Sequence, residues 1–325
     1  MKRRTFITGL GSTVAWPLAA RAQQPALPVI GFLGTQCADD YKLLILRFVQ
    51  GLKEAGYVED QNVSIEYRYA ANQMDRLPGH VADLVRRRVA VIVTSATAAT
   101  LEAKSATTTI PIVFGTAGDP VALGLVASLN RPGANLTGIA SLGAELQPKQ
   151  LQLLHELIPN AAVFGVLADP AVPEIQSIIA DLQAAARTLG LQLVFVNART
   201  DSDLETAFVT FSQQHVGALL VSAGSFYYGR RGQLAALAAR HALPAIYPDR
   251  EFALAGGLIA YGSSFGYLWH QASIYTGRIL KGEKPADLPV QQATRIELVI
   301  NLKTAKALGL TIPETLLATA DEVIQ

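Results

Sequence analysis

Short apolar runs rich in β-branched residues alternate along the chain with longer stretches in which apolar residues recur every three or four positions. The short runs are typical of buried strands and the longer stretches of amphipathic helices. In the first part of the chain this pattern predicts strands at residues 29–33, 63–67, 91–93, 112–114 and 136–139. It predicts helices at residues 43–55, 77–88, 98–105 and 121–129. The alternation indicates a doubly wound, Rossmann-like lobe in which helices cover both faces of a parallel sheet.

The same alternation begins again after the turn-forming segment 131–135, which contains proline and glycine. It predicts a helix at residues 149–157 and strands at 163–167, 191–196, 218–221, 245–247 and 258–260. Segments 89–96 and 216–223 resemble each other, as do 110–114 and 243–247, which indicates duplication of a lobe. We therefore expect lobe 1 at residues 28–139, lobe 2 at residues 140–261, and a C-terminal helix and strand at residues 262–325 that pack across the lobes.

Candidate ligand contacts follow from this arrangement, because ligands of parallel α/β sheets bind beyond the carboxyl ends of the strands. Gln36 follows the first strand, and Ser95 and Thr97 lie where a strand meets a helix whose N-terminal N–H groups suit a carboxylate or phosphate. Thr116 and Asp119, in a glycine-containing turn, suit an amino or hydroxyl group. Two alternatives stay open: Ser95 or Thr97 caps its own helix, and Asp119 begins the next one.

Lobe 2 offers a corresponding set of residues at its strand ends. Ser222 and Asp249 are the polar candidates, and Phe226, Tyr228 and Tyr261 are candidates for contact with the apolar body of a ligand. Aromatic residues at such positions either belong to the core or form one wall of a pocket. The arginine runs at 86–88 and 230–231 lie in helical segments and are expected to be solvated. Two facing sets of strand ends predict a hinged cleft between the lobes.

The first 22 residues have the features of a cleaved export signal. Arg3 and Arg4 precede a weakly apolar run at residues 7–18, and the segment 20–22 has the small-x-small pattern cut by signal peptidase. The mature protein should begin near Gln23. An arginine pair before a run of moderate hydrophobicity is typical of the twin-arginine route, so we expect a periplasmic location. The alternative, a membrane anchor, requires about 20 apolar residues, and this run is shorter and contains glycines.

Composition narrows the function further. Hydrophobic residues make up 50% of the chain, charged residues 16%, and the net charge is +1, which argues against a nucleic-acid partner or a disordered tail. After the signal no apolar stretch is long enough to enter a membrane, and we expect a monomer. The single cysteine, Cys37, excludes an intramolecular disulfide; we expect a small buried residue, with a reactive thiol as the alternative.

Catalytic motifs and metal-ligand patterns in the sequence give no support for an enzyme. The chain lacks His-Glu-x-x-His, Cys-x-x-Cys and a Walker loop, and the mature chain lacks Gly-x-Gly-x-x-Gly after the first strand. The five histidines are scattered without metal-ligand spacing. The sequence therefore predicts no enzymatic activity, no cofactor and no metal.

Several longer strings resemble one bacterial family, the ABC transporter substrate-binding proteins that include tryptophan- and tyrosine-binding members. They are residues 50–59, 110–114 with 119–121, 130–138, 277–290 and 296–310. The resemblance implies a type I periplasmic binding fold, with solute held between two α/β lobes joined by several hinge crossings, and an ABC permease of the inner membrane as partner. Ala134 and Ala98 stand where members of the family often have glycine and proline.

The function that these observations favour is a solute receptor that closes around an amino-acid-like, possibly aromatic, metabolite. Two other classes stay open. A ligand sensor for a membrane signalling protein would use the same cleft with another partner. An exported cofactor enzyme would fit the twin-arginine signal but lacks catalytic residues.

Overall fold

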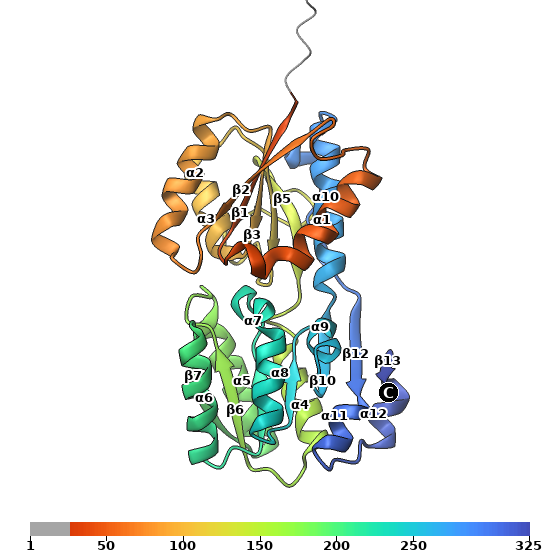
Figure 1. Cartoon of the computed structure of the whole chain (residues 1–325). Helices are drawn as coiled ribbons and strands as arrows, with labels where there is room; N and C mark the ends of the chain where they lie inside the picture. The colour runs from red at the N-terminus through yellow and green to blue at the C-terminus, as the bar shows by residue number, and fades with distance from the viewer. Residues whose placement is uncertain (1–26) are drawn as a thin grey trace, which may run out of the picture.

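The computed structural model describes residues 27–325, so the expected export signal lies outside the described residues. Figure 1 shows two α/β lobes, one above the other. Lobe 1 has a six-stranded sheet in the order β11-β5-β4-β3-β1-β2, and lobe 2 a seven-stranded sheet in the order β13-β12-β10-β9-β8-β6-β7. The predicted fold class, two doubly wound lobes with largely parallel sheets, is confirmed.

Lobe 1 is built from the predicted alternation, with strands slightly longer than expected. Its strands are β1 (Val29–Gly34), β2 (Ser64–Tyr69), β3 (Val91–Ser95), β4 (Ile112–Thr116) and β5 (Leu136–Ser141), all paired in parallel. Helix α1 (Lys42–Glu54) packs on one face through Leu44 and Phe48. Helices α2 (Leu77–Arg86) and α3 (Thr97–Ala106) pack on the other face. Each face thus buries its own apolar cluster.

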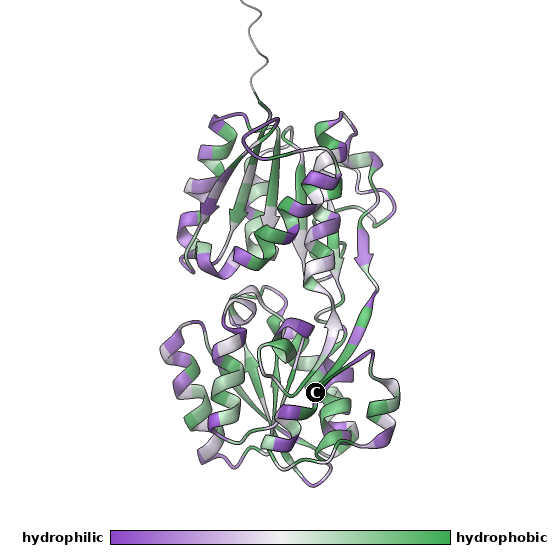
Figure 2. Ribbon diagram, turned by 45° about the vertical axis from the view of Figure 1, so that its right-hand side comes forward, coloured by the Kyte–Doolittle hydropathy of each residue, from purple (hydrophilic) through white to green (hydrophobic). Residues whose placement is uncertain are grey.

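Lobe 2 repeats this plan. Its strands are β6 (Val163–Ala168), β7 (Gln192–Asn197), β8 (Ala218–Val221), β9 (Ala245–Tyr247) and β10 (Ile259–Ser263). Helices α4 (Gln147–Leu157) and α5 (Ile175–Leu189) cover one face, and α6 (Asp201–Gln213), α7 (Ser225–Gly229), α8 (Arg231–Arg240) and α9 (Arg250–Leu254) the other. Figure 2 shows mostly hydrophobic strands, with hydrophilic residues on the outer helix faces.

The C-terminal segment connects the lobes. Helix α10 (Phe265–Leu280) follows β10 of lobe 2 but packs against α1 in lobe 1, and β11 (Gln291–Ala293) then pairs with β5. The chain returns as β12 (Ile296–Asn301), which is antiparallel to β10, and ends with α11 (Leu302–Ala307), α12 (Glu314–Thr319) and β13 (Glu322–Ile324). The described chain therefore crosses between the lobes after β5, after β10 and after β11.

Two local predictions are wrong. Residues 121–129 form consecutive turns instead of a helix, because Gly124 takes a positive φ of 65° and the carbonyl of Pro120 accepts two backbone hydrogen bonds in a tight loop. Cys37 is half-buried instead of buried, because it lies outside the core clusters at the start of the short 3-10 helix η1 (Ala38–Tyr41).

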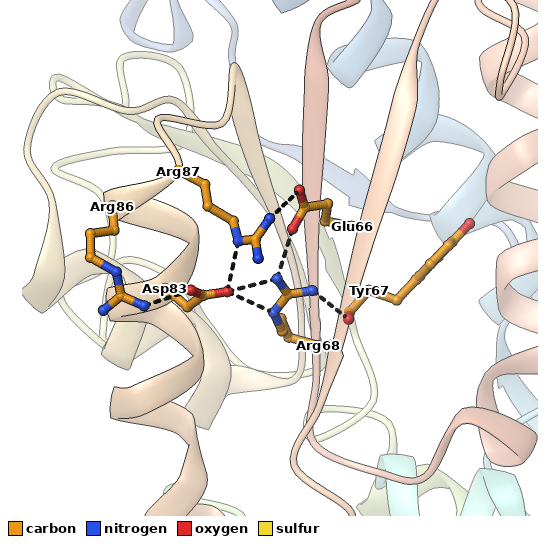
Figure 3. A network of polar contacts seen from close by, with 6 residues as sticks. All are labelled: Glu66, Tyr67, Arg68, Asp83, Arg86 and Arg87. Carbon is orange, nitrogen blue, oxygen red and sulfur yellow. Dashed lines mark hydrogen bonds and ion pairs between the residues drawn. The ribbon is translucent and has the colours of Figure 1, made fainter.

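Arg86 and Arg87, expected to be solvated, form ion pairs with acidic residues of lobe 1. Figure 3 shows Asp83 of α2 accepting hydrogen bonds from Arg68, Arg86 and Arg87, while Glu66 pairs with Arg68 and Arg87. The Arg68 guanidinium lowers the pKa of Asp83 to about 2. Because Glu66 and Arg68 belong to the edge strand β2, this network ties the edge of the lobe 1 sheet to α2.

Candidate functional site

A cavity lies between the lobes at the carboxyl ends of the strands, with an empty volume of about 1060 Å³ counted out to its open mouth. Both lobes line it. The contribution of lobe 1 includes Thr35, Gln36, Met74, Ala96, Thr97, Ala98, Gly115, Thr116, Ala117 and Gly118. The polar and aromatic part of the contribution of lobe 2 is Gln147, Asp169, Glu174, Arg199, Ser225, Tyr228, Asp249, Phe252, Ser263 and Phe265. A solute in this cavity would touch both lobes.

The wall in lobe 1 is suited to an anionic group. Ala96, the residue before α3, has a φ of 79°, an uncommon conformation for a residue other than glycine, and it turns the start of the helix towards the cavity. The first N–H groups of a helix have no partner within the helix and lie at the positive end of its dipole. The hydroxyls of Thr97 and Thr116 lie beside them, 2.7 Å apart. Together they form a set of donors for a carboxylate.

The wall in lobe 2 is acidic. Glu174, at the start of α5, accepts a hydrogen bond from Thr97 across the cleft at 3.2 Å through Oε1, while its Oε2 is buried without a hydrogen-bond partner among the described residues. Asp169, which follows β6, accepts from the N–H of Ala171 and forms an ion pair with Arg199 at 3.4 Å. Burial raises the pKa of both Asp169 and Glu174. A cationic group placed here would be stabilised by carboxylates that little water reaches.

Asp249 lines the cavity, but its two oxygens are already engaged. Oδ1 accepts from the N–H of Glu251 at 2.8 Å and Oδ2 from the N–H of Phe265 at 2.7 Å. Complete burial raises the pKa of Asp249 to about 6. The carboxyl group caps α9 and holds the first residue of α10, so it fixes a crossing between the lobes.

An aromatic surface completes the cavity. The rings of Tyr228 and Phe265 lie 4.6 Å apart, and Phe252 packs edge-on against Tyr228. Burial raises the pKa of the Tyr228 hydroxyl, which therefore stays protonated. These rings offer an apolar face to the body of a ligand.

Of the predicted contacts, Gln36, Thr97, Thr116, Tyr228 and Asp249 line the cavity. The other five do not. Ser95 is fully buried in β3, and Asp119 is exposed and caps the following turn by accepting from the N–H groups of Val121 and Ala122. The alternative for Asp119, that it begins the next helix, holds only in part: Asp119 caps the segment that follows it, but that segment forms turns instead of a helix.

The three remaining residues belong to the packing of lobe 2. The Ser222 hydroxyl donates to the carbonyl of Leu167 at 2.7 Å. Phe226, on α7, is fully buried in the core, and Tyr261 packs against the core on the side of α4 and α5. A strand end places a residue near the cleft, but the pleat and the following turn decide whether its side chain faces the cavity.

Sequence reasoning missed Gln147, Asp169, Glu174 and Arg199. Asp169 lies two positions after the strand predicted at residues 163–167 and directly after β6, so the rule that selected Ser222 also applies to it. Glu174 lies several residues beyond that strand, in a turn without a recognisable motif. Gln147 begins a helix that the periodicity placed from residue 149 onward.

The lobes also touch outside the cavity. Arg230 of lobe 2 forms an ion pair with Asp40 of η1 at 2.7 Å, with only 17% and 12% of the two side chains exposed. It also pairs with Asp201 of its own lobe, and its guanidinium lies over the Phe226 ring. The prediction that Arg230 is solvated is therefore wrong, because the facing lobe covers it.

Within residues 27–325 no group of histidine, cysteine or acidic residues is placed to hold a metal ion. No helix in this part of the chain is long and apolar enough to span a membrane.

Two α/β lobes, three crossings and a cavity that both lobes line are the features of two-lobed solute-binding proteins of the type I periplasmic class. Comparison with known families gives the same result more specifically. The model of the ABC transporter substrate binding protein family matches residues 42–324. The chain belongs to this family, whose members bind a small solute outside the cytoplasm and deliver it to an ABC permease.

Individual relatives agree. The tyrosine-binding protein of Clostridioides difficile is 25% identical over 264 residues, which are 81% of this chain and 75% of that protein. A conserved domain protein from Vibrio cholerae has a TM-score of 0.82 and 26% identity, covering 91% of this chain and 99% of its own. An ABC domain in complex with L-Trp from Streptococcus pneumonia has a TM-score of 0.80 and 25% identity, covering 92% and 100%.

Proposed function

We propose that the protein is the periplasmic component of an ABC importer and that its solute is an L-amino acid, with aromatic side chains favoured. The observation that supports this most directly is the pairing of opposite subsites across the cleft. Donors at the start of α3 face Glu174, and the Thr97 hydroxyl already bonds to that carboxylate at 3.2 Å. An α-amino acid carries both a carboxylate and an ammonium group, so one molecule has a partner for each wall.

In this arrangement the ligand carboxylate binds the N–H groups of α3 with the hydroxyls of Thr97 and Thr116. The ammonium group binds Glu174 and Asp169. The cavity lining contains three acidic side chains and one arginine, so it favours a cation over a second anion. The rings of Tyr228 and Phe265 contact the apolar body.

Binding would drive closure because the ligand bonds to both lobes only when the lobes approach each other. The ligand replaces the direct bond between Thr97 and Glu174 and satisfies the unpartnered Oε2 of Glu174. The permease would then recognise the closed form. Two relatives support an aromatic ligand: one is named for tyrosine binding, and the other was solved in complex with L-Trp.

A thermal-shift screen of the L-amino acids, followed by calorimetry, tests this function. A ligand at 100 times its dissociation constant stabilises the folded state by about 2.7 kcal/mol. Tyramine, which lacks the carboxylate, and 3-(4-hydroxyphenyl)propionate, which lacks the ammonium group, should bind at least about tenfold more weakly than L-tyrosine. If no L-amino acid shifts the melting temperature, or if both analogues bind as well as L-tyrosine, the proposal is wrong.

A paired substitution assigns the ammonium subsite. Glu174→Gln should weaken binding of the amino acid about tenfold or more while leaving that of the propionate analogue unchanged. Glu156→Gln, on the exposed face of α4, is the matched control and should change neither.

The export route is part of the same proposal. Arg3 and Arg4 support the twin-arginine pathway, so replacing both with lysine should leave the unprocessed protein in the cytoplasm. Fractionation of cells that express the two forms measures this. Equal export of both would exclude the twin-arginine route.

That the protein is a monomer stays a prediction, to be checked by light scattering.

A further inference from the structure

Gln147 combines complete burial with an unsatisfied amide. It is the first residue of α4, its side chain has no exposed surface, and it lines the cavity between the lobes. Neither Oε1 nor Nε2 has a hydrogen-bond partner among the described residues. Such groups are rare in native proteins because an amide that leaves water without new hydrogen bonds is destabilising. Because Gln147 lines the cavity, a ligand that enters it would be able to supply the missing hydrogen bonds.

A neighbour one turn along the helix shows the contrast. Gln150 is also fully buried; its Nε2 donates to the carbonyl of Tyr261 at 2.7 Å, while its Oε1 has no hydrogen-bond partner among the described residues. The environment of α4 thus supplies a partner to one of the two polar atoms of this amide. The amide of Gln147, which faces the cavity lining, is left free at both ends.

The surroundings of Gln147 in the cavity wall are apolar. Ala144, whose carbonyl accepts from the N–H of Gln147, lines the cavity together with Val172 and Ile178. All three belong to or pack against the same apolar cluster, between α4 and α5. This aliphatic part of the wall, together with the amide of Gln147, is suited to a ligand group that is apolar along its length and polar at one point.

We infer that Gln147 determines side-chain specificity by forming hydrogen bonds with a hydroxyl or ring N–H of the solute. The inference rests on the proposed function, since it concerns the side chain of the bound amino acid. The amide oxygen accepts from a phenolic hydroxyl or an indole N–H, and the amide nitrogen is available to donate to a phenolic oxygen. Phenylalanine would fill the same space but leave the amide unpaired. Sites of this kind discriminate strongly against the analogue that lacks the polar group.

Calorimetry with L-tyrosine, L-tryptophan and L-phenylalanine on the wild type and on Gln147→Met tests the inference. Methionine keeps the length of the side chain and removes both hydrogen-bonding groups. The wild type should bind L-tyrosine or L-tryptophan at least about tenfold more tightly than L-phenylalanine. In Gln147→Met that preference should fall to within about twofold, chiefly through loss of the polar ligand's affinity.

A stability measurement separates this role from a structural one. Because Gln147 has no partner in the described structure, Gln147→Met should keep or raise the melting temperature of the ligand-free protein. Gln150→Met is the matched control: it loses the hydrogen bond to Tyr261 but lies outside the cavity lining, so it should keep the ratio of affinities.

The outcomes distinguish the two proposals. If an amino acid binds but L-phenylalanine binds as tightly as the polar aromatics, or if Gln147→Met leaves their ratio unchanged, the inference about Gln147 is wrong and the solute-binding function stands. If none of the amino acids binds to the wild type, the proposed ligand class is wrong, and the inference fails with it.

Discussion

Neutralising Asp40 should weaken ligand binding although Asp40 does not line the cavity. Its carboxylate pairs with Arg230 of the other lobe at 2.7 Å, and this contact exists only when the lobes are together. In Asp40→Asn the closed form loses the ion pair, while the open form loses nothing. The N–H of Cys37 donates a hydrogen bond to Asp40, and the side-chain oxygen of Asn would still accept it, so the first turn of η1 should stay intact.

The size of the effect follows from the burial of the pair. Exposed ion pairs contribute about 0–1 kcal/mol and breaking a buried pair costs about 3–5 kcal/mol. With 17% and 12% of the side chains exposed, this pair lies between those limits, and Arg230 keeps Asp201 as a second partner at 2.9 Å. We expect closure to lose about 1–2 kcal/mol, which raises the dissociation constant about 5- to 30-fold.

Calorimetry on the wild type and Asp40→Asn, at low and high salt, measures this with the L-amino acid that binds best. Because salt screens partly exposed charges, added salt should weaken binding by the wild type more than by the variant. Glu205→Gln is the control, since it removes the exposed pair with Arg240 within lobe 2. Equal dissociation constants for the wild type and Asp40→Asn, with the same salt dependence, would refute the role of this pair in closure.

Four further predictions concern the cavity and the frame of lobe 1. In Gly118→Ala the new Cβ would clash with Glu174 Oε1, so affinity should fall at least about tenfold with the ligand-free melting temperature unchanged. Gly79→Ala, in open space on α2, should keep the calorimetric affinity and slightly raise the melting temperature, because alanine favours the helix more than glycine does. Burial raises the pKa of Glu174 and a bound ammonium group would lower it again, so binding releases protons, and calorimetry should show affinity decreasing as pH falls from 7 towards 5. Asp119→Ala removes only a turn cap, so it should cost about 1 kcal/mol in chemical denaturation and leave ligand affinity unchanged. Asp83→Ala should lower the melting temperature by releasing β2 from α2, again with affinity unchanged.

The sequence alone determined the architecture of both lobes. Strands such as β1 and β8 are short apolar runs that only a sheet covered on both faces can bury, and the helices between them show the periodicity of one buried face. Because parallel strands all end at the same edge, the pattern also brought Thr97, Thr116 and Tyr228 to the cleft. These are consequences of local periodicity.

Only the tertiary structure decided which side chains meet inside the cleft. Thr97 and Glu174 are 77 positions apart and bond across it, and Arg230, predicted to be solvated, is covered by η1 of the facing lobe. Asp119 and Ser222 occupy equally good sequence positions but bond to their own backbone surroundings. The spacing of apolar residues indicates which face of a helix or strand is buried. Contacts across the cleft depend on how the three crossings orient two separately packed lobes, and that orientation is a property of the whole chain.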